Sequence, residues 1–134
     1  AMCNAARRGV EVDLIVDNES NKPLVQLAQE SYYDALLDAG VRIHGYHGNF
    51  LHSKLMTIDA HVGLIGSSNL DRRSFELNEE ISVLIYDQEV VCEMDAIEQC
   101  YIDQSDIVDA ATWPKRPVWK RLLQNVARLF DSLM

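Results

Sequence analysis

Two side chains with complementary chemistry lie close together near the middle of the chain: His52 and Lys54. In an extended strand, residues two apart point to the same face, so the imidazole and the ammonium are expected side by side. The pair suits an anionic group, because the ammonium neutralises negative charge while the imidazole can act as a nucleophile or carry a proton. Alone, this spacing is a weak signal, since many strands carry such residues.

A second polar segment strengthens the interpretation. Gly66, Ser67 and Asn69 form a Gly-Ser-x-Asn sequence after an expected strand. Its hydroxyl, amide and backbone N–H groups can donate hydrogen bonds to phosphate oxygens. Glu80 begins the following strand, where a carboxylate can hold an imidazole in one tautomer. The pattern therefore favours a phosphoryl-binding site.

Strands and helices must position these residues. A strand, a helix and a second strand are predicted over residues 10–46, with Pro23 at the helix start and Gly40 at its end. This unit implies parallel strands. Residues 53–58 and 62–65 flank a short turn and predict a hairpin, followed by a strand at 81–86 and helices at 88–104 and 119–130. The expected fold class is an α/β sandwich with a mixed, largely parallel sheet flanked by helices.

With these motifs the sequence resembles the phospholipase D superfamily. His52, Lys54 and Asp59 match its HKD motif, Ser67 and Asn69 match its downstream Gly-Ser-x-Asn, and Glu80 matches its histidine-supporting glutamate. Softer features over nearly the whole chain resemble the C-terminal half of a bacterial cardiolipin synthase. The resemblance implies these roles: catalytic His52, Lys54, Asp59 and Glu80, with Lys54, Ser67 and Asn69 binding the substrate phosphate.

The resemblance also implies a reaction. In this family a phosphatidyl group is transferred in two steps through a phosphohistidine, with phosphatidylglycerol as both donor and acceptor. No metal or other cofactor is implied, because Lys54, Asn69 and their counterparts neutralise the phosphoryl oxygens. His52 is expected to be either the nucleophile or the acid–base group, since the two halves of the family's site are pseudo-symmetric.

The sequence departs from the family in one respect. Cardiolipin synthases carry two HKD motifs, whereas none of His44, His47 and His61 is followed by a lysine two residues later. We therefore expect half a site, completed by a missing N-terminal half or by a second copy of the chain. Two alternatives stay open: a single-motif phosphodiesterase or nuclease active as a homodimer, and a non-catalytic lipid-binding module.

Charge and composition limit the partners. The formal net charge is −9, which argues against a nucleic-acid protein that relies on bulk attraction to phosphate. The charge is uneven: no lysine or arginine occurs between Ser74 and Pro114, and cations return after that point. No apolar run is long enough to span a bilayer.

The last segment is a separate feature of the expected organisation. Residues 1–112 are predicted to form the single-motif catalytic domain, and residues 113–134 an amphipathic helix packed on it or on a membrane. Cations beside an apolar helix face suit an anionic surface. The full-length protein is expected at the bacterial cytoplasmic membrane, with this part soluble.

Half an active site is not expected to catalyse turnover of a substrate. We expect the 134-residue chain alone to have little or no synthase activity, measured by thin-layer analysis of phosphatidylglycerol incubated with it. Full turnover by a strictly monomeric sample would contradict this.

Overall fold

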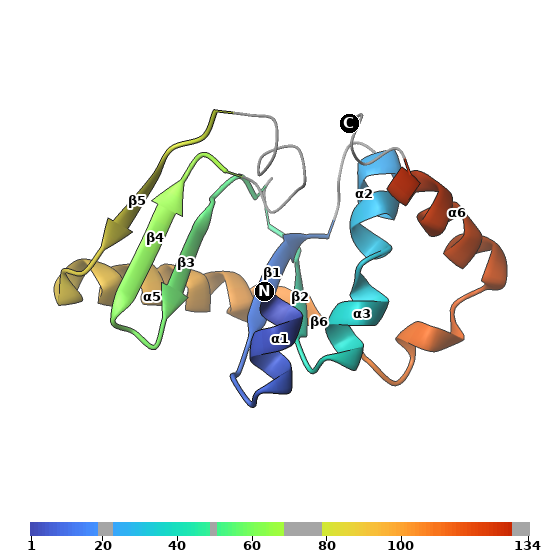
Figure 1. Ribbon diagram of the computed structural model, residues 1–134, viewed down its shortest axis with the longest axis horizontal. Helices are drawn as coiled ribbons and strands as arrows, with labels where there is room; N and C mark the ends of the chain where they lie inside the picture. The colour runs from blue at the N-terminus through green and yellow to red at the C-terminus, as the bar shows by residue number, and fades with distance from the viewer. Residues whose placement is uncertain (19–22, 49–50, 69–78, 130–134) are drawn as a thin grey trace. The chain divides into compact units, whose positions relative to one another are not determined.

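A computed structural model describes residues 1–18, 23–48, 51–68 and 79–129 (Figure 1). The chain forms two compact units, each described here by itself. The first unit comprises residues 1–51 and 104–134, and the second unit comprises residues 52–103. Within the described residues, no helix combines the length and apolar character needed to cross a bilayer.

The first unit contains the predicted strand–helix–strand arrangement. Strands β1 (Asp13–Asp17) and β2 (Arg42–Tyr46) pair in parallel, which confirms the expectation. β6 (Ser105–Ile107) adds an antiparallel strand on the other side of β2 and was not predicted, because three residues carry too little periodicity. The remaining elements of this unit are α1 (Met2–Arg7), α2 (Pro23–Glu30), α3 (Tyr33–Asp38), η1 (Trp113–Lys115) and α6 (Val118–Leu129).

The helix expected over residues 23–40 is interrupted where α2 ends and α3 begins. At the break, the Ser31 hydroxyl donates to the Ala28 carbonyl at 2.6 Å, a local bond that competes with the helical pattern. Beyond α3, Gly40 adopts φ +93°, as its place at the helix end predicts. The core beneath consists of Tyr33, Leu36, Val41 and Ile43.

In the described part of the second unit, a helix packs on a sheet. β3 (Leu55–Ile58), β4 (Val62–Gly66) and β5 (Ser82–Ile85) form an antiparallel meander, and α5 (Gln88–Asp103) covers one face (Figure 1). The predicted hairpin is confirmed. Asp87 caps α5, since its carboxylate accepts from the N–H groups of Glu89 at 3.0 Å and Val90 at 3.2 Å.

The expectation of a largely parallel sheet was wrong. The described strands form two three-stranded sheets in which β1–β2 is the parallel pair, and the other three pairings are antiparallel. The physical reason is connection length: a parallel pair needs a long crossover, whereas the link from β3 to β4 is a tight turn that allows antiparallel pairing alone. The broader prediction of a mixed α/β fold is confirmed.

A carboxylate lies in the contact between α5 and the sheet. The Thr57 hydroxyl donates to Glu98 at 2.5 Å, and Asp95 lies 3.3 Å from the same hydroxyl. Burial raises the pKa of Glu98, and the nearby negative charge of Asp95 adds to this effect. The neutral form of Glu98 is therefore the one that folding favours.

This shift makes a prediction for stability. A carboxyl whose pKa is raised on folding binds its proton more tightly in the native state. Its contribution to the free energy of unfolding is therefore fully present below its unfolded pKa and is lost as the pH rises through its folded pKa. We expect Glu98→Gln to raise the free energy of unfolding at pH 7, because the amide removes the buried charge. Urea unfolding of both proteins between pH 4 and pH 8 measures this.

The matched control is Glu93→Gln on the exposed side of the same helix, which should change little. An unfolding free energy at pH 7 that falls for Glu98→Gln would contradict the prediction.

Candidate functional site

His52 and Lys54 lie in the segment that leads into β3. The intervening Ser53 hydroxyl lies 3.0 Å from the Tyr101 hydroxyl of α5, which fixes Ser53 toward the helix. The backbone carbonyl of Lys54 accepts from the Gly66 N–H at 3.0 Å, so the chain is already extended there. Alternate residues of an extended chain point to opposite sides, so we expect His52 and Lys54, which flank Ser53, to face away from α5.

The lysine ammonium is held close to this segment. Lys54 Nζ donates to the backbone oxygen of His52 at 2.9 Å, which uses one of its three N–H groups. His52 itself is exposed. The ammonium therefore lies beside the His52 backbone, and the juxtaposition of the ammonium with the imidazole stays a prediction.

Ser67 and Glu80, predicted from separate motifs, meet at the same end of the sheet. The Ser67 hydroxyl donates to Glu80 Oε2 and accepts from the Ile81 N–H at 3.1 Å. The Ser67 N–H donates to the Ile81 carbonyl at 3.0 Å, which extends the β4–β5 ladder by one residue. The hydroxyl proton of Ser67 is thus directed at a carboxylate, where the sequence had assigned it to a phosphate.

A steric constraint explains why residue 66, just before Ser67, is a glycine. A Cβ placed on Gly66 would lie 2.6 Å from the backbone oxygen of Ile81 and 3.0 Å from Cα of Ser82. Both are backbone atoms, so a side chain at this position would push the start of β5 away. The close approach that Gly66 permits is what brings Glu80 within reach of Ser67.

The structure does not bring Asp59 to this group. Asp59 occupies the turn between β3 and β4 with φ 50°, and Ala60 follows with φ 51°, while the His61 N–H donates to the Ile58 carbonyl at 3.0 Å. At about 3.3 Å per residue, the turn is roughly 16 Å along the chain from Lys54. A short polar side chain tolerates the left-handed region well, so the position of Asp59 fits a role in the turn.

Asn69, the remaining predicted phosphate ligand, lies outside the described residues. Its assignment stays a prediction.

The first unit carries a polar group around His47 that the sequence analysis did not predict. His47 follows β2, with Nε2 2.7 Å from Asp106 Oδ2 and Nδ1 3.1 Å from Asn18 Nδ2. With the Asn18 amide donating to Nδ1, the proton of the neutral ring lies on Nε2 and is donated to Asp106. Asn18 and His47 both follow parallel strands at their carboxyl ends, which is the signal that could have paired them.

His44, by contrast, is a buried hydrogen-bond partner of Asp13. Its Nε2 lies 2.7 Å from Asp13 Oδ1, and Arg42 donates to both carboxylate oxygens of Asp13 at 2.7 and 2.6 Å. The Arg42 guanidinium, with a smaller contribution from His44, holds the pKa of Asp13 below its ordinary value. This cluster is therefore an internal link between β1 and β2.

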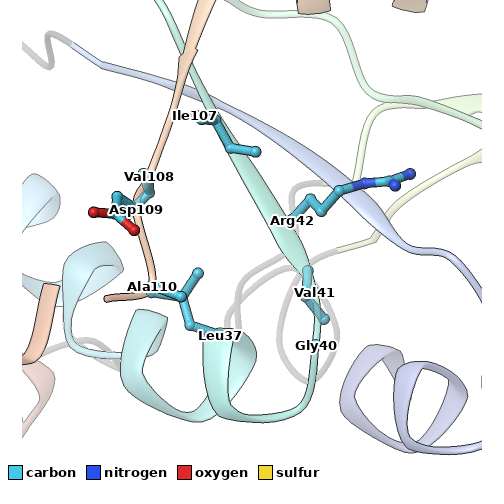
Figure 2. Close-up of a pocket in the computed structure, with 8 residues that line it drawn as sticks. All are labelled: Leu37, Gly40, Val41, Arg42, Ile107, Val108, Asp109 and Ala110. Atoms are coloured by element: carbon cyan, nitrogen blue, oxygen red, sulfur yellow. The ribbon is translucent and has the colours of Figure 1, made fainter. Parts of the chain in front are cut away.

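A pocket of about 390 Å³ lies elsewhere in the first unit, and it holds none of the predicted site residues (Figure 2). Its apolar lining comes from Leu37, Val41, Ile107 and Val108. Its two charged residues have partners of their own, since Arg42 binds Asp13 and Asp109 accepts from the Ala111 N–H at 2.9 Å. Neither charged group is directed at a common ligand position.

Comparison with known proteins places this chain in a family. The family model described as cardiolipin synthase, PLD-like domain, matches residues 1–101. The chain belongs to this phospholipase D-like domain family of cardiolipin synthase. The resemblance drawn from the sequence is thereby confirmed.

Individual relatives support the same family assignment. The chain is 38% identical over 134 residues to cardiolipin synthase A of Serratia proteamaculans and 37% identical over the same length to that of Yersinia pseudotuberculosis. In both cases all of this chain matches 28% of the relative, so the chain spans little more than a quarter of the length of these enzymes. It is homologous to one part of cardiolipin synthase A.

The fold has a solved counterpart. The phospholipase D family member Nuc from Salmonella typhimurium matches 79% of this chain and 69% of its own, with a TM-score of 0.62 and 20% identity. At that identity the match supports the phospholipase D fold.

The close approach at Gly66 makes a prediction. Gly66→Ala should cost about 1–3 kcal/mol of stability through overpacking and break the Ser67–Glu80 hydrogen bond by displacing Glu80. Chemical unfolding measures the first effect, and a crystal structure of the variant measures the second.

Gly63→Ala in the middle of β4 is the control. A Cβ there would lie 2.6 Å from Met94 Sδ, a flexible side chain of α5, so we expect a loss of stability with the Ser67–Glu80 hydrogen bond kept. A Ser67–Glu80 hydrogen bond that is intact in both variants would show that the Gly66 contact does not hold this pair.

Proposed function

We propose that this chain supplies one half of the active site of a cardiolipin synthase. In this proposal His52 and Lys54 handle the phosphodiester of phosphatidylglycerol, and a phosphatidyl group passes to a second phosphatidylglycerol through a phosphohistidine. The observation that supports the proposal is that the Lys54 ammonium lies at the His52 backbone, while the Ser67–Glu80 pair lies at the adjoining strand ends.

The chemistry has two steps. First, a histidine nitrogen bonds to phosphorus, the P–O bond to the headgroup glycerol breaks, and an acid protonates the departing oxygen. Second, the glycerol hydroxyl of another phosphatidylglycerol attacks phosphorus, its proton passes to the same acid–base group, and the P–N bond breaks to leave cardiolipin. His52 takes one of these two roles, and its counterpart in the other half-site takes the other.

The remaining residues act on charge and orientation. Lys54 neutralises the non-bridging phosphoryl oxygens as charge builds on them. Ser67 donates to Glu80, so we assign Ser67 to holding this carboxylate in place and Glu80 to orienting an imidazole. Asn69 joins Lys54 as a phosphate donor in the proposal.

The second half-site comes, in this proposal, from the rest of a longer protein that works at the bacterial cytoplasmic membrane. Three observations support it. The chain has one His-x-Lys sequence, it spans 28% of its relatives' length, and the sheet face on which we expect His52 continues into exposed apolar side chains. These are Met56 and Ile58 of β3 and Leu84 of β5. An exposed apolar face of this kind is typical of a surface that another part of a protein covers.

A substrate with a different leaving group tests the role of His52. In the full-length enzyme, His52→Ala should lower cardiolipin formation from phosphatidylglycerol by at least about 10³-fold. A phosphatidyl ester of p-nitrophenol needs no proton on its leaving group, so it bypasses the general acid. The measurement is the burst of p-nitrophenol released by the variant in the first turnover.

The two roles differ in outcome. No burst assigns the nucleophile to His52, and a retained burst assigns it the acid–base role. Near-normal cardiolipin formation by His52→Ala would overturn the proposal. Cleavage of single-stranded DNA by the wild-type enzyme, with no cardiolipin formed, would favour the phosphodiesterase alternative.

A further inference from the structure

Helix α6 packs on its own unit through its polar side. Gln124 and Ala127 are each 1% exposed, where α6 contacts α2 (Figure 1). Gln124 Nε2 donates to Glu30 Oε2 at 2.7 Å, and Lys120 Nζ lies 3.0 Å from the same oxygen. An amphipathic helix normally turns its apolar stripe to the core, so this packing is inverted.

A second set of polar contacts holds that orientation. Arg116 Nε donates to Gln124 Oε1 at 2.9 Å, and its two terminal nitrogens donate to the Asp34 carboxylate at 2.8 and 2.7 Å. The guanidinium also lies 4.6 Å from the centre of the Trp113 ring. Donors and acceptors of the network are matched, so α6 has a defined rotation about its axis.

That rotation turns the apolar stripe of α6 outward. At about 100° per residue, the large apolar residues of this helix fall within one sector of its surface. The exposed fractions reach 78% at Val118, 64% at Leu122 and 77% at Leu129. The full outward stripe consists of Val118, Trp119, Leu122, Leu123, Val126 and Leu129.

Charge next to the stripe indicates what covers it. Arg121 and Arg128 are seven residues apart and lie on one edge of the stripe, both exposed. Within the described residues neither makes a salt bridge, although the Arg128 guanidinium lies 4.7 Å from the centre of the Tyr32 ring. The nearby acids Glu30 and Asp34 are paired with Lys120 and Arg116. Residues 110–130 contain no aspartate or glutamate. The surface is therefore apolar with a cationic border.

The geometry points to an anionic phospholipid bilayer as the occupant of this stripe. The 12 residues of α6 are too short to cross a bilayer, so the helix lies in the plane of the interface. Its apolar side chains enter the boundary between headgroups and acyl chains, Trp119 sits at the headgroup level, and Arg121 and Arg128 contact lipid phosphates. The inference rests on the proposed function only in that the substrate is itself an anionic lipid of such a bilayer.

A label at one position tests the surface in the intact protein. In the full-length protein with its native cysteines replaced by serine, Leu122→Cys carries an environment-sensitive fluorophore. Arg8→Cys, exposed at the end of α1, is the matched control. Quenching is measured with nitroxide-bearing lipids and with aqueous iodide, in vesicles of phosphatidylglycerol with phosphatidylcholine and of phosphatidylcholine alone.

The expected result is strong nitroxide quenching at position 122 in phosphatidylglycerol vesicles, with position 8 quenched mainly by iodide. Arg121→Gln combined with Arg128→Gln should lower the lipid-facing fraction roughly fivefold per arginine. Iodide quenching at position 122 in both vesicles would overturn the inference. Protection from both quenchers would overturn it too, because a second copy or another part of the protein would then cover α6.

A kinetic measurement separates this inference from the proposed function. Leu122→Gln with Val126→Gln should raise the KM for phosphatidylglycerol in vesicles, while conversion of a short-chain, monomeric phosphatidylglycerol stays unchanged. An equal loss on both substrates would contradict surface docking. A wild-type enzyme that makes no cardiolipin, yet shows lipid quenching at position 122, would reject the proposed function and leave the docking surface intact.

Discussion

Close packing between the end of β4 and the start of β5 is the constraint on which the candidate site depends. Gly66 lies so near Ile81 and Ser82 that no side chain fits, and this proximity carries Ser67 to Glu80. On its other side, the Gly66 N–H bonds the Lys54 carbonyl. One glycine thus ties together three chain segments that each bring a polar group to the same end of the sheet.

Helix α5 decides which face of that sheet is available for chemistry. It anchors Ser53 and Thr57 by hydrogen bonds to Tyr101 and Glu98, so Lys54 and Met56, which alternate with them, are expected to turn the other way. Because side chains alternate along a strand, covering one face with a helix is expected to present His52 and Lys54 on the other. The helix contributes no residue to the predicted set, yet it determines its orientation.

The net charge of −9 has little bearing on this site or on α6. At physiological ionic strength, charges separated by more than about 8 Å are largely screened. Acids that lie farther than this from the site therefore do little to prevent a local cation such as Lys54 from binding a phosphate. At α6, Arg116 and Lys120 neutralise the adjacent acids, and Arg121 and Arg128 are exposed.

Sequence by itself determined the features that depend on short-range periodicity. The β3–β4 hairpin and the parallel β1–β2 pair follow from alternation, turn residues and helix-end signals over a few residues. The same local signals also identified the family, because the motif residues themselves carry the chemistry.

Tertiary structure alone decided which distant residues meet. Ser67 and Glu80 are paired by strand register, and Gln124 finds Glu30 across 94 residues of chain. Asp59, although part of the sequence motif, lies in a turn at the other end of its strand. Periodicity shows that α6 has two faces, but it does not show which face turns inward. That choice came from a buried hydrogen-bond network whose members are scattered along the sequence.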